Sequence, residues 1–507
     1  MYKLLFFILT AALFIGGCSN KTADQKDIFR YGTTAYGTSM DNAGVDPHIN
    51  YQGWSAIRYG VGETLFRLDT QMQPQPWLAT KYEYLDAKTC KITLRDNINF
   101  SSGRKLTAEA VKECLEHLIS VHDRAAEDLK ISRITASGQE LIIRTAEPLP
   151  ALLNYLCDPY ACIIDMQSKT SDGSPVAGTG PFVAQRVTPQ EILLQRNSNY
   201  WDGPVKTTSI LIKSIPDGDT LTMALQSGEI DAAQGLPYAS LKLFRDNPAF
   251  TISSTDTSRV FQAALNYDSP ALQDARVRAA VALAVDREAF CKILLDGNGT
   301  PASGPFPASL PYGTAWQPSS YDIAAARRLL AEAGWRDSDN DGYVDKDGRP
   351  LTLRWLTYPA RQELPLLAEA AQQYLKNIGI KTEVNITDNY AAFLKNGQWD
   401  IYAKAFVSAP TGEPEYYFTT HVPASSVYNA GHYRNPQAEA LLQALRSEIQ
   451  PPKRTQLAHQ LSQLLTEDNA YIYYAHLKMS LIMKNNVHGL TAHPSDYYEI
   501  TSSLAKE

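Results

Sequence analysis

Strand-like and helix-like segments alternate along almost the whole chain after residue 28, and this alternation restricts the fold more than any other feature of the sequence. Strands are predicted where apolar and polar residues alternate with a period of two, at residues 91–95, 140–144, 191–195 and 209–213. Helices are predicted where apolar residues recur at helical spacing, at residues 107–120, 275–294, 323–333, 364–378, 438–447 and 453–466. The mixture predicts an α/β class with α+β elements. Because about 480 residues after the leader are too many for one hydrophobic core, we expect two or three domains.

The N-terminal segment predicts export and lipid attachment. A positive charge near the start precedes an apolar run over residues 4–15, which is too short to span a bilayer comfortably. The segment Ile15-Gly16-Gly17-Cys18 resembles a bacterial lipobox, which implies a signal peptide at residues 1–17 and a lipid on Cys18. Residues 18–28 are then a polar, lipidated tether. Since no later stretch reaches the ~20 apolar residues of a spanning helix, we expect a chain anchored to the cell membrane by its lipid and facing the periplasm or the cell exterior.

Composition and motif content argue against several function classes. The net charge is −7, with both signs mixed along the chain, so there is no basic stripe of the kind that binds nucleic acid. There is no G-x-S-x-G elbow, H-E-x-x-H helix, C-x-x-C pair or phosphate-binding loop, so we expect neither an enzyme nor an intrinsic cofactor. The cysteines after Cys18 are odd in number and cannot all pair within the chain. We favour buried, unreactive thiols, although a disulfide between Cys157 and Cys162 is the alternative. The cysteines concerned are Cys90, Cys114, Cys157, Cys162 and Cys291.

Several short segments stand in an order that points to one family over nearly the whole mature chain. They include Val61-Gly62-Glu63-Thr64-Leu65-Phe66, Leu94-Arg95-Asp96-Asn97-Ile98-Asn99-Phe100, Gly178-Thr179-Gly180-Pro181-Phe182, Asn197-Ser198-Asn199-Tyr200-Trp201, Ser227-Gly228-Glu229-Ile230-Asp231, Ala284-Val285-Asp286-Arg287 and Leu329-Leu330-Ala331-Glu332-Ala333-Gly334-Trp335. In this order the chain resembles the bacterial extracellular solute-binding proteins of family 5, the substrate-binding proteins of oligopeptide, dipeptide and nickel ABC importers. The resemblance implies a monomeric carrier that works with ABC permease and ATPase subunits.

The resemblance also implies a fold. It is a two-lobed periplasmic-binding-protein type II fold with a hinge and an interlobe cleft, in its large three-subdomain variant. Lobe I is expected at residues 29–265 and 480–507, with an inserted subdomain at about 66–180, and lobe II at residues 266–479. In such a protein, closure of the lobes replaces the water around a solute with fixed protein groups.

The stretch from residue 405 to residue 418 is the most informative about the solute. Peptide binders of the family place an aspartate there for the ammonium group of the peptide, whereas this chain has Ser408-Ala409-Pro410. An unpaired buried ammonium is costly, so the resemblance favours the nickel and metallophore branch. We therefore expect a chelate of nickel, cobalt or a related metal with histidine or an opine-type molecule. An oligopeptide or dipeptide is the alternative.

Such a chelate needs cations for its carboxylates and aromatic walls for its organic part. Arg124 stands where nickel-binding relatives have a carboxylate-binding arginine, although a surface arginine on a charged turn is the competing interpretation. Tyr51 and Trp54 follow a loop that lines the cleft in relatives. The other candidate ligand-binding residues lie in or near the informative stretch and are Ser408, Thr411 and Tyr416.

Histidines could complete the coordination of the metal from the protein side. The candidates are His421 and His432, which bracket a loop near the ligand histidine of nickel–histidine binders, and His48, on the loop before Tyr51. The competing interpretation of each is a polar loop residue. A separate segment, residues 337–342, matches the opening of a calcium loop, but Gly348 stands where a bidentate glutamate is expected, so we predict a solvated turn.

Overall fold

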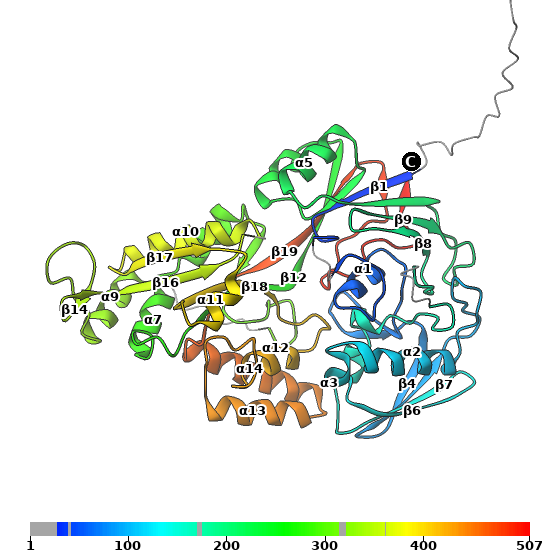
Figure 1. Cartoon of the computed structure of the whole chain (residues 1–507), viewed down its shortest axis with the longest axis horizontal. Helices are drawn as coiled ribbons and strands as arrows, with labels where there is room; N and C mark the ends of the chain where they lie inside the picture. The colour runs from blue at the N-terminus through cyan, green and yellow to red at the C-terminus, as the bar shows by residue number, and fades with distance from the viewer. Residues whose placement is uncertain (1–27, 39–41, 170–174, 314–320, 360) are drawn as a thin grey trace, which may run out of the picture.

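The computed structural model describes residues 28–38, 42–169, 175–313, 321–359 and 361–507. The predicted signal peptide, Cys18 and residues 18–27 of the tether lie outside the described residues. Strand β1 begins at Ile28, the last residue assigned to the tether. The chain forms a two-lobed body of mixed α and β structure (Figure 1), as the sequence predicts. Within the described residues, no helix is both long and apolar enough to cross a membrane.

One mixed sheet of eleven strands runs through both lobes. Its order is β17-β16-β18-β12-β19-β11-β1-β10-β9-β8, and β13 pairs with β19 off this path. The first-lobe strands are β1 (Ile28–Thr33), β8 (Phe182–Val187), β9 (Glu191–Arg196), β10 (Ser209–Ser214) and β11 (Ala232–Gln234). The second-lobe strands are β13 (Gly299–Pro301), β16 (Thr352–Thr357), β17 (Lys381–Ile386) and β18 (Ile401–Val407). Two long strands, β12 (Phe250–Leu265) and β19 (Tyr471–Lys484), link the lobes (Figure 1).

The two linking strands change partners on the way. Residues 250–256 of β12 pair with β19 alone, whereas residues 259–265 pair with β18, and 260–264 of these also pair with β19. The β12–β19 ladder is interrupted between Asp256 and Val260, where its register shifts. Each strand therefore belongs to both lobes, with an irregular segment of β12 at residues 257–259 between them.

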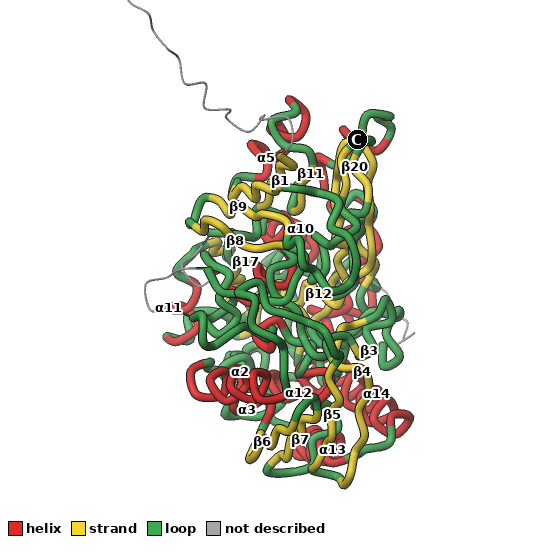
Figure 2. Tube along the Cα trace, turned by 90° about the vertical axis from the view of Figure 1, so that its right-hand side faces the viewer, coloured by secondary structure: helices red, strands yellow, loops and turns green. Residues whose placement is uncertain are grey.

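The first lobe carries an additional sheet of four strands. They are β4 (Ala79–Asp86), β5 (Thr89–Leu94), β6 (Ile131–Ser137) and β7 (Glu140–Thr145), in the order β4-β5-β7-β6. Helix α2 (Ala108–Val121) packs on β6 and β7 with its apolar face, and short α3 (Ala125–Leu129) follows it (Figure 2). The Thr107 side chain accepts a hydrogen bond from Ala110 N and so begins α2, as its sequence predicts.

Helices cover both faces of the second-lobe sheet. On one face, α7 (Ala275–Leu283), α9 (Ile323–Glu332) and α10 (Glu363–Lys376) share a core with β16 and β18. On the other face lie α12 (Glu415–His421), α13 (Pro436–Ser447) and α14 (Pro451–Glu467). Short α11 (Tyr390–Lys395) lies between β17 and β18 in the chain. The predicted helices at 323–333, 364–378, 438–447 and 453–466 are confirmed within a few residues.

The single helix predicted at residues 275–294 is wrong. Helix α7 ends at Leu283, and the Asp286 side chain accepts a hydrogen bond from Ala289 N to start the three-residue helix α8 (Arg287–Ala289). A turn with π-type hydrogen bonding follows at residues 290–294. The aspartate therefore interrupts a run whose apolar spacing is helical throughout.

The cysteines of the described residues are buried and free. The Cys157 thiol donates to the Leu153 carbonyl at 3.3 Å and does not bond to Cys162. Burial raises the pKa of both thiols. They are packing residues in this structure, which agrees with the favoured interpretation of the sequence.

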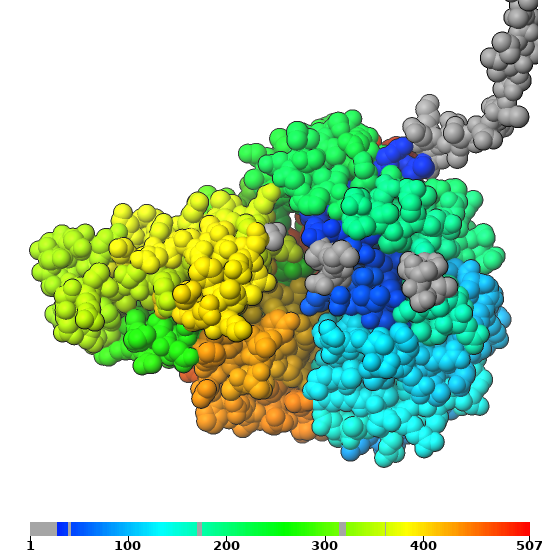
Figure 3. All heavy atoms as spheres, in the orientation of Figure 1, coloured from blue at the N-terminus to red at the C-terminus, as the bar shows by residue number. Residues whose placement is uncertain are grey.

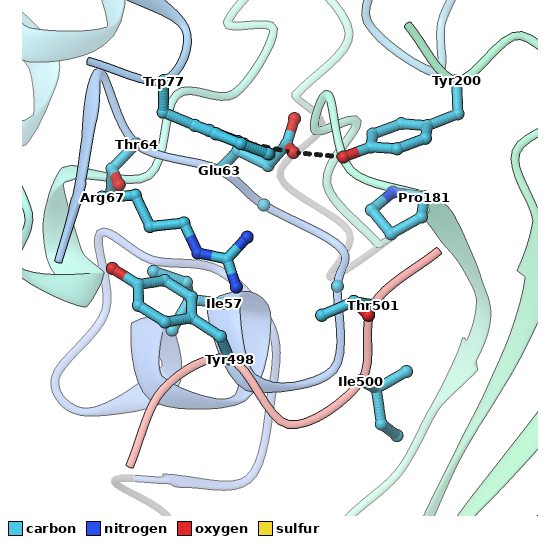
Figure 4. A pocket seen from close by; sticks show the side chains of 12 residues that line it. Ile57, Glu63, Thr64, Arg67, Trp77, Pro181, Tyr200, Tyr498, Ile500 and Thr501 are labelled. Atoms are coloured by element: carbon cyan, nitrogen blue, oxygen red, sulfur yellow. Dashed lines mark hydrogen bonds between the residues drawn. The ribbon is translucent and has the colours of Figure 1, made fainter. Parts of the chain in front are cut away.

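Glu63 joins several segments of the first lobe, close to α1 (Gln52–Arg58). Its buried carboxylate accepts hydrogen bonds from Trp77 Nε1 and Trp201 Nε1, both at 2.9 Å, and from Thr179 Oγ1 and the Tyr200 hydroxyl, both at 2.8 Å. Figure 4 shows Trp77 and Tyr200 on the two sides of this carboxylate. Burial raises the pKa of Glu63, and these four donors act against that rise. Three of the segments that carry the family resemblance, 61–66, 178–182 and 197–201, thus meet at one carboxylate.

Candidate functional site

A cavity of about 770 Å³ lies between the two lobes. Its first-lobe wall comes from α1 and residues 494–496, and its second-lobe wall from the start of α10 and the end of β18. Residues 257–259 of β12 and 478–480 of β19 also line it. Figure 3 shows the surface hollowed between the yellow α10 and α11 side and the blue α1 side. Since both lobes and both linking strands contribute, closure of the lobes would enclose whatever the cavity holds.

The cleft wall has more basic than acidic side chains. Arg58 is neutralised, because its guanidinium lies 2.8 Å from Asp496 Oδ2 and 3.0 Å from Glu499 Oε1. Arg259, at the bend of β12, lies 3.7 Å from the same Asp496 carboxylate. Burial, with the neighbouring charge of Arg361, lowers the pKa of Arg259 to about 10. The basic lining residues are Arg58, Arg259, Arg361 and Lys478, and the acidic ones are Glu363 and Asp496.

Tyr51 and Trp54 line the cleft from the first lobe, where the sequence expectation places them. Tyr51 precedes α1 and is 48% exposed. Trp54 packs edge-on against Tyr497 at 5.2 Å between ring centres, and the Arg58 guanidinium lies 5.4 Å from its ring centre. Trp54 is thus held by its neighbours, and Tyr51 is the more exposed of the two residues.

Arg124 lies at the start of α3, beside the cleft and not among the residues that line the cavity. Its Nη2 is 3.0 Å from Asp128 Oδ2 and 3.1 Å from Asp158 Oδ2. The guanidinium also lies 5.3 Å from the ring centre of Tyr160 and 5.5 Å from that of Tyr416 on α12. Arg124 therefore connects the first lobe to the second, and two carboxylates of the protein already engage its charge.

The Tyr416 ring belongs to an aromatic cluster formed by Phe406, Tyr416, His421 and Tyr428. Phe406 is central, because it stacks on Tyr416 at 5.8 Å, meets His421 edge-on at 4.6 Å and meets Tyr428 at 5.8 Å between ring centres. Tyr428 remains 38% exposed. The Lys404 ammonium lies 5.0 Å from the Phe406 ring centre and 5.5 Å from that of Tyr428.

Ser408 and Thr411 are buried in the turn after β18. The Ser408 hydroxyl donates to the Ser258 carbonyl at 2.9 Å, and the Thr411 carbonyl accepts from Asn154 Nδ2 at 2.8 Å. Ser408 thereby holds the turn against the bend of β12, and Thr411 holds it against the first lobe. Neither residue is among those that line the cavity. Both support the site from behind in this structure.

The three candidate histidines do not come together. Among the described residues, a single group of three or more His, Cys, Asp or Glu side chains has ligand atoms within 4.8 Å of one another, and it is the exposed acidic turn of Asp337, Asp339 and Asp341. That turn adjoins β14 (Asp345–Lys346) at the far end of the second lobe (Figure 1).

Each candidate histidine has its own surroundings. His421 is buried and stacks on Tyr417 at 4.1 Å, and burial lowers its pKa well below the usual range. His48 is buried, with Nδ1 2.8 Å from His117 Nδ1, and burial lowers its pKa to about 2. His432 is exposed, with Nδ1 2.5 Å from Asp268 Oδ2. His48 and His421 are held as neutral packing residues.

Comparison with known proteins identifies the family. Residues 73–429 match the sequence model of the bacterial extracellular solute-binding proteins, family 5 (Middle). The chain belongs to this family. The nickel-binding protein NikA of Staphylococcus aureus is 27% identical over 477 residues, covering 93% of each chain. The glutathione-binding protein GsiB of Salmonella paratyphi A is 27% identical over 443 residues, covering 82% of this chain and 83% of the other.

A solved structure of the family confirms the two-lobed fold. NikA from Staphylococcus aureus in complex with Ni(L-His)2 superposes with a TM-score of 0.81 at 25% identity, over 95% of this chain and 100% of the other. The chain is thus a member of a family of solute-binding proteins, and the relatives named here are solute-binding proteins too.

Sequence reasoning missed three cations of this family 5 protein, which are Arg259, Arg361 and Lys404. Lys404 carried a usable signal, because it is the lone charge in the otherwise apolar strand Ile401-Tyr402-Ala403-Lys404-Ala405-Phe406-Val407. Arg259 and Arg361 carried none, since arginines near strand and helix ends are common on protein surfaces. Their place in the cleft becomes evident only when the lobes are assembled.

Proposed function

We propose that the chain captures a transition-metal chelate, with nickel or a related metal such as cobalt, outside the cytoplasmic membrane. The observation that supports this proposal most is the pair of cleft cations Arg259 and Arg361, which face a first-lobe wall containing Tyr51 and Trp54. Histidine and opine-type chelators present carboxylates on an organic frame, and such molecules need fixed cations and aromatic contacts. The nickel-binding relatives agree with this chemistry.

In this proposal the chelate arrives assembled, and the metal is cargo. The chelator supplies the metal ligands, because His48 and His421 are packed into the protein and His432 pairs with Asp268. Arg124 and Tyr416, at the edge of the interface between the lobes, contact an outer part of the chelate. Tyr51, on the first-lobe wall, contacts the organic part of the chelate.

Capture would proceed by closure of the lobes about the linking strands. We place the hinge at residues 257–259 of β12 and the adjoining residues 477–479 of β19, where the ladder is irregular. In β12 this point precedes the lobe boundary expected between residues 265 and 266, so residues 260–265 would move with lobe II (266–479), while lobe I would keep the earlier part of 29–265 together with 480–507. The closed monomer would be recognised by an ABC permease with its ATPase, while a lipid on Cys18 holds the carrier at the membrane.

Isothermal titration calorimetry of the purified protein tests the proposed function. Nickel with two equivalents of L-histidine should bind saturably at one chelate per chain. Nickel chloride alone and L-histidine alone are the controls, and each should bind much more weakly. If the nickel–histidine complex gives no saturable heat while another probe does, the chelate assignment is wrong.

A small peptide is the second candidate, and the glutathione-binding relatives favour it. Glutathione is a tripeptide with two carboxylates, so it could use the same cleft cations. Titration with glutathione and with di- to pentapeptides belongs in the same experiment. Tight binding of glutathione without a response to nickel–histidine would make this family 5 protein a carrier of anionic peptides.

A further inference from the structure

Lys404 is a cation placed in the interior of the second lobe. Successive side chains of β18 point to opposite faces of the sheet, so Lys404 lies on the same face as Phe406, toward α12. Its pairing partner on the neighbouring strand β12 is Gln262. The residue is 7% exposed. Its ammonium lies over the rings of Phe406 and Tyr428 at 5.0 and 5.5 Å. The four-carbon stem therefore crosses the core and ends at the aromatic cluster.

The ammonium has no counter-ion of its own. Among the described residues, Lys404 Nζ has ring contacts with Phe406 and Tyr428 and forms neither a hydrogen bond nor an ion pair. Burial lowers the pKa of Lys404 to about 7. His421 on α12 and the ring of Tyr428 lie beside it, and burial lowers the pKa of His421, so this histidine stays neutral.

Other buried cations of this lobe are partnered. Arg454 pairs with Glu413 and Glu415, and Arg278 donates to the carbonyls of Leu272 and Gln273. A buried ammonium without such partners destabilises the folded protein. Residues of this kind are found where the charge is used to bind a ligand. Lys404 departs from the pattern that the rest of the lobe follows.

The surroundings of Lys404 lead to the interface between the lobes. Tyr428 is 38% exposed, and Phe406 stacks on Tyr416. Tyr416 in turn lies 5.5 Å from the guanidinium of Arg124 in the first lobe. An anion placed on the aromatic cluster would thus meet Lys404 from the second lobe and lie close to Arg124 from the first.

We propose that Lys404 is a specificity-determining residue, whose ammonium binds a carboxylate of the solute at the aromatic cluster and repels solutes that present an ammonium there. This inference rests on the proposed function and deepens it, because it assigns the second lobe a charge requirement. A carboxylate provides the counter-ion that the apo protein lacks. The rings exclude water around the pair and strengthen it.

The test compares Lys404→Met with Lys376→Met, a control in the same lobe at the exposed end of α10. The probes are nickel with two equivalents of L-histidine, glutathione, and nickel with histamine, which lacks the carboxylate. Lys404→Met should lower the affinity for whichever carboxylate probe the wild type binds by about ten- to hundredfold. Lys404→Arg keeps the positive charge and should lose less affinity. The wild type should prefer nickel–histidine to nickel–histamine, and Lys404→Met should lose that preference.

A second measurement separates ligand binding from a structural role. Because Lys404→Met removes an unpartnered buried charge, the apo variant should unfold at a higher temperature than the wild type while it binds more weakly. Unchanged affinity in Lys404→Met, with a wild type that binds a carboxylate probe, overturns the role of Lys404 and leaves the proposed function standing. A wild type that binds neither carboxylate probe overturns the proposed function, and the inference with it. Lower thermal stability of apo Lys404→Met also overturns the inference.

Discussion

Glu63 and Lys404 are both buried charged residues, and the protein treats them in opposite ways. Glu63 receives four hydrogen bonds from Trp77, Thr179, Tyr200 and Trp201. Lys404 has two aromatic rings and no hydrogen-bond or ion-pair partner among the described residues. The first site lies within one lobe, and the second lies next to the interface between the lobes.

The difference separates charges that hold the fold from charges that, in the proposed function, are available to a solute. A carboxylate with four donors is stabilising only while all the donors are present, so it fixes the segments that supply them. A cation short of partners contributes nothing of this kind to the apo protein. Arg259 resembles Lys404, since its nearest carboxylate, Asp496, is already used by Arg58.

Loss of the Glu63 carboxylate should have the largest effect. Glu63→Ala should lower the free energy of unfolding by about 4 kcal/mol, roughly 1 kcal/mol for each of the four donors left without an acceptor. Urea denaturation measures this change. The matched control is Glu113→Ala, which removes a partly exposed carboxylate from Arg104 and should cost under about 0.5 kcal/mol. Equal effects of the two substitutions would break the comparison.

Replacement of Arg259 should act on binding and not on folding. Arg259→Met should weaken the binding free energy of a carboxylate-bearing solute by about 1.5–3 kcal/mol, because the buried carboxylate of the solute then lacks a charged donor. The apo protein should keep its stability, since Asp496 still pairs with Arg58 at 2.8 Å. Calorimetry gives the affinity and urea denaturation gives the stability. A large loss of stability with unchanged affinity would move Arg259 into the same class as Glu63.

Arg124 should behave as an intermediate case. Arg124→Ala leaves Asp128 and Asp158 without their shared cation, so the free energy of unfolding should fall by about 1–3 kcal/mol. The sequence alone predicts little change in stability for this variant, because it does not reveal these carboxylates. Affinity should fall less than in Arg259→Met, because the Arg124 charge is already shared. Thermal unfolding of the apo variant, compared with Arg328→Ala on exposed α9, measures the structural part.

Much of the fold could be predicted from the sequence because its elements carry local signals. Helix α2 begins at a capping threonine, and strands β7, β9 and β10 alternate apolar and polar residues. The linking strands were missed because their sequences do not alternate cleanly. The half of β12 from residue 260 is buried between two partner strands and two layers of helices, so its residues are apolar on both faces except at Gln262.

The candidate site was less predictable than the fold. Tyr51 and Trp54 do line the cleft, because a short local segment places them there. Arg259, Arg361 and Lys404 come from three segments of the chain, and only their tertiary arrangement shows which charges lack partners. The ring of His421 shows the converse, because its sequence position suggested a metal ligand while its packing against Tyr417 depends on the assembled core.

His476 provides the smallest and most selective test of the comparison. It is a buried base on β19, and neither it nor Lys404 is among the residues that line the cavity; Lys404 differs in lying over the aromatic cluster. Burial lowers the pKa of His476 to about 3, so the folded protein keeps it neutral while the unfolded chain protonates it near pH 6.5. Its contribution to stability is therefore present above pH 6.5 and is lost as the pH falls toward 3, by about 1.4 kcal/mol per pH unit.

His476→Leu should consequently remove part of the acid sensitivity of the protein. Between pH 7.5 and pH 5.5 the wild type should lose about 1.4 kcal/mol more stability than this variant, while both bind the solute equally well at pH 7.5. Urea denaturation at the two pH values measures the difference, and His488→Leu, at an exposed histidine, is the control. Other buried histidines titrate in both proteins and cancel in the comparison. If His476→Leu also weakened solute binding at pH 7.5, a buried base away from the aromatic cluster would affect the solute as Lys404 is expected to. The comparison between Lys404 and the rest of the core would then be wrong.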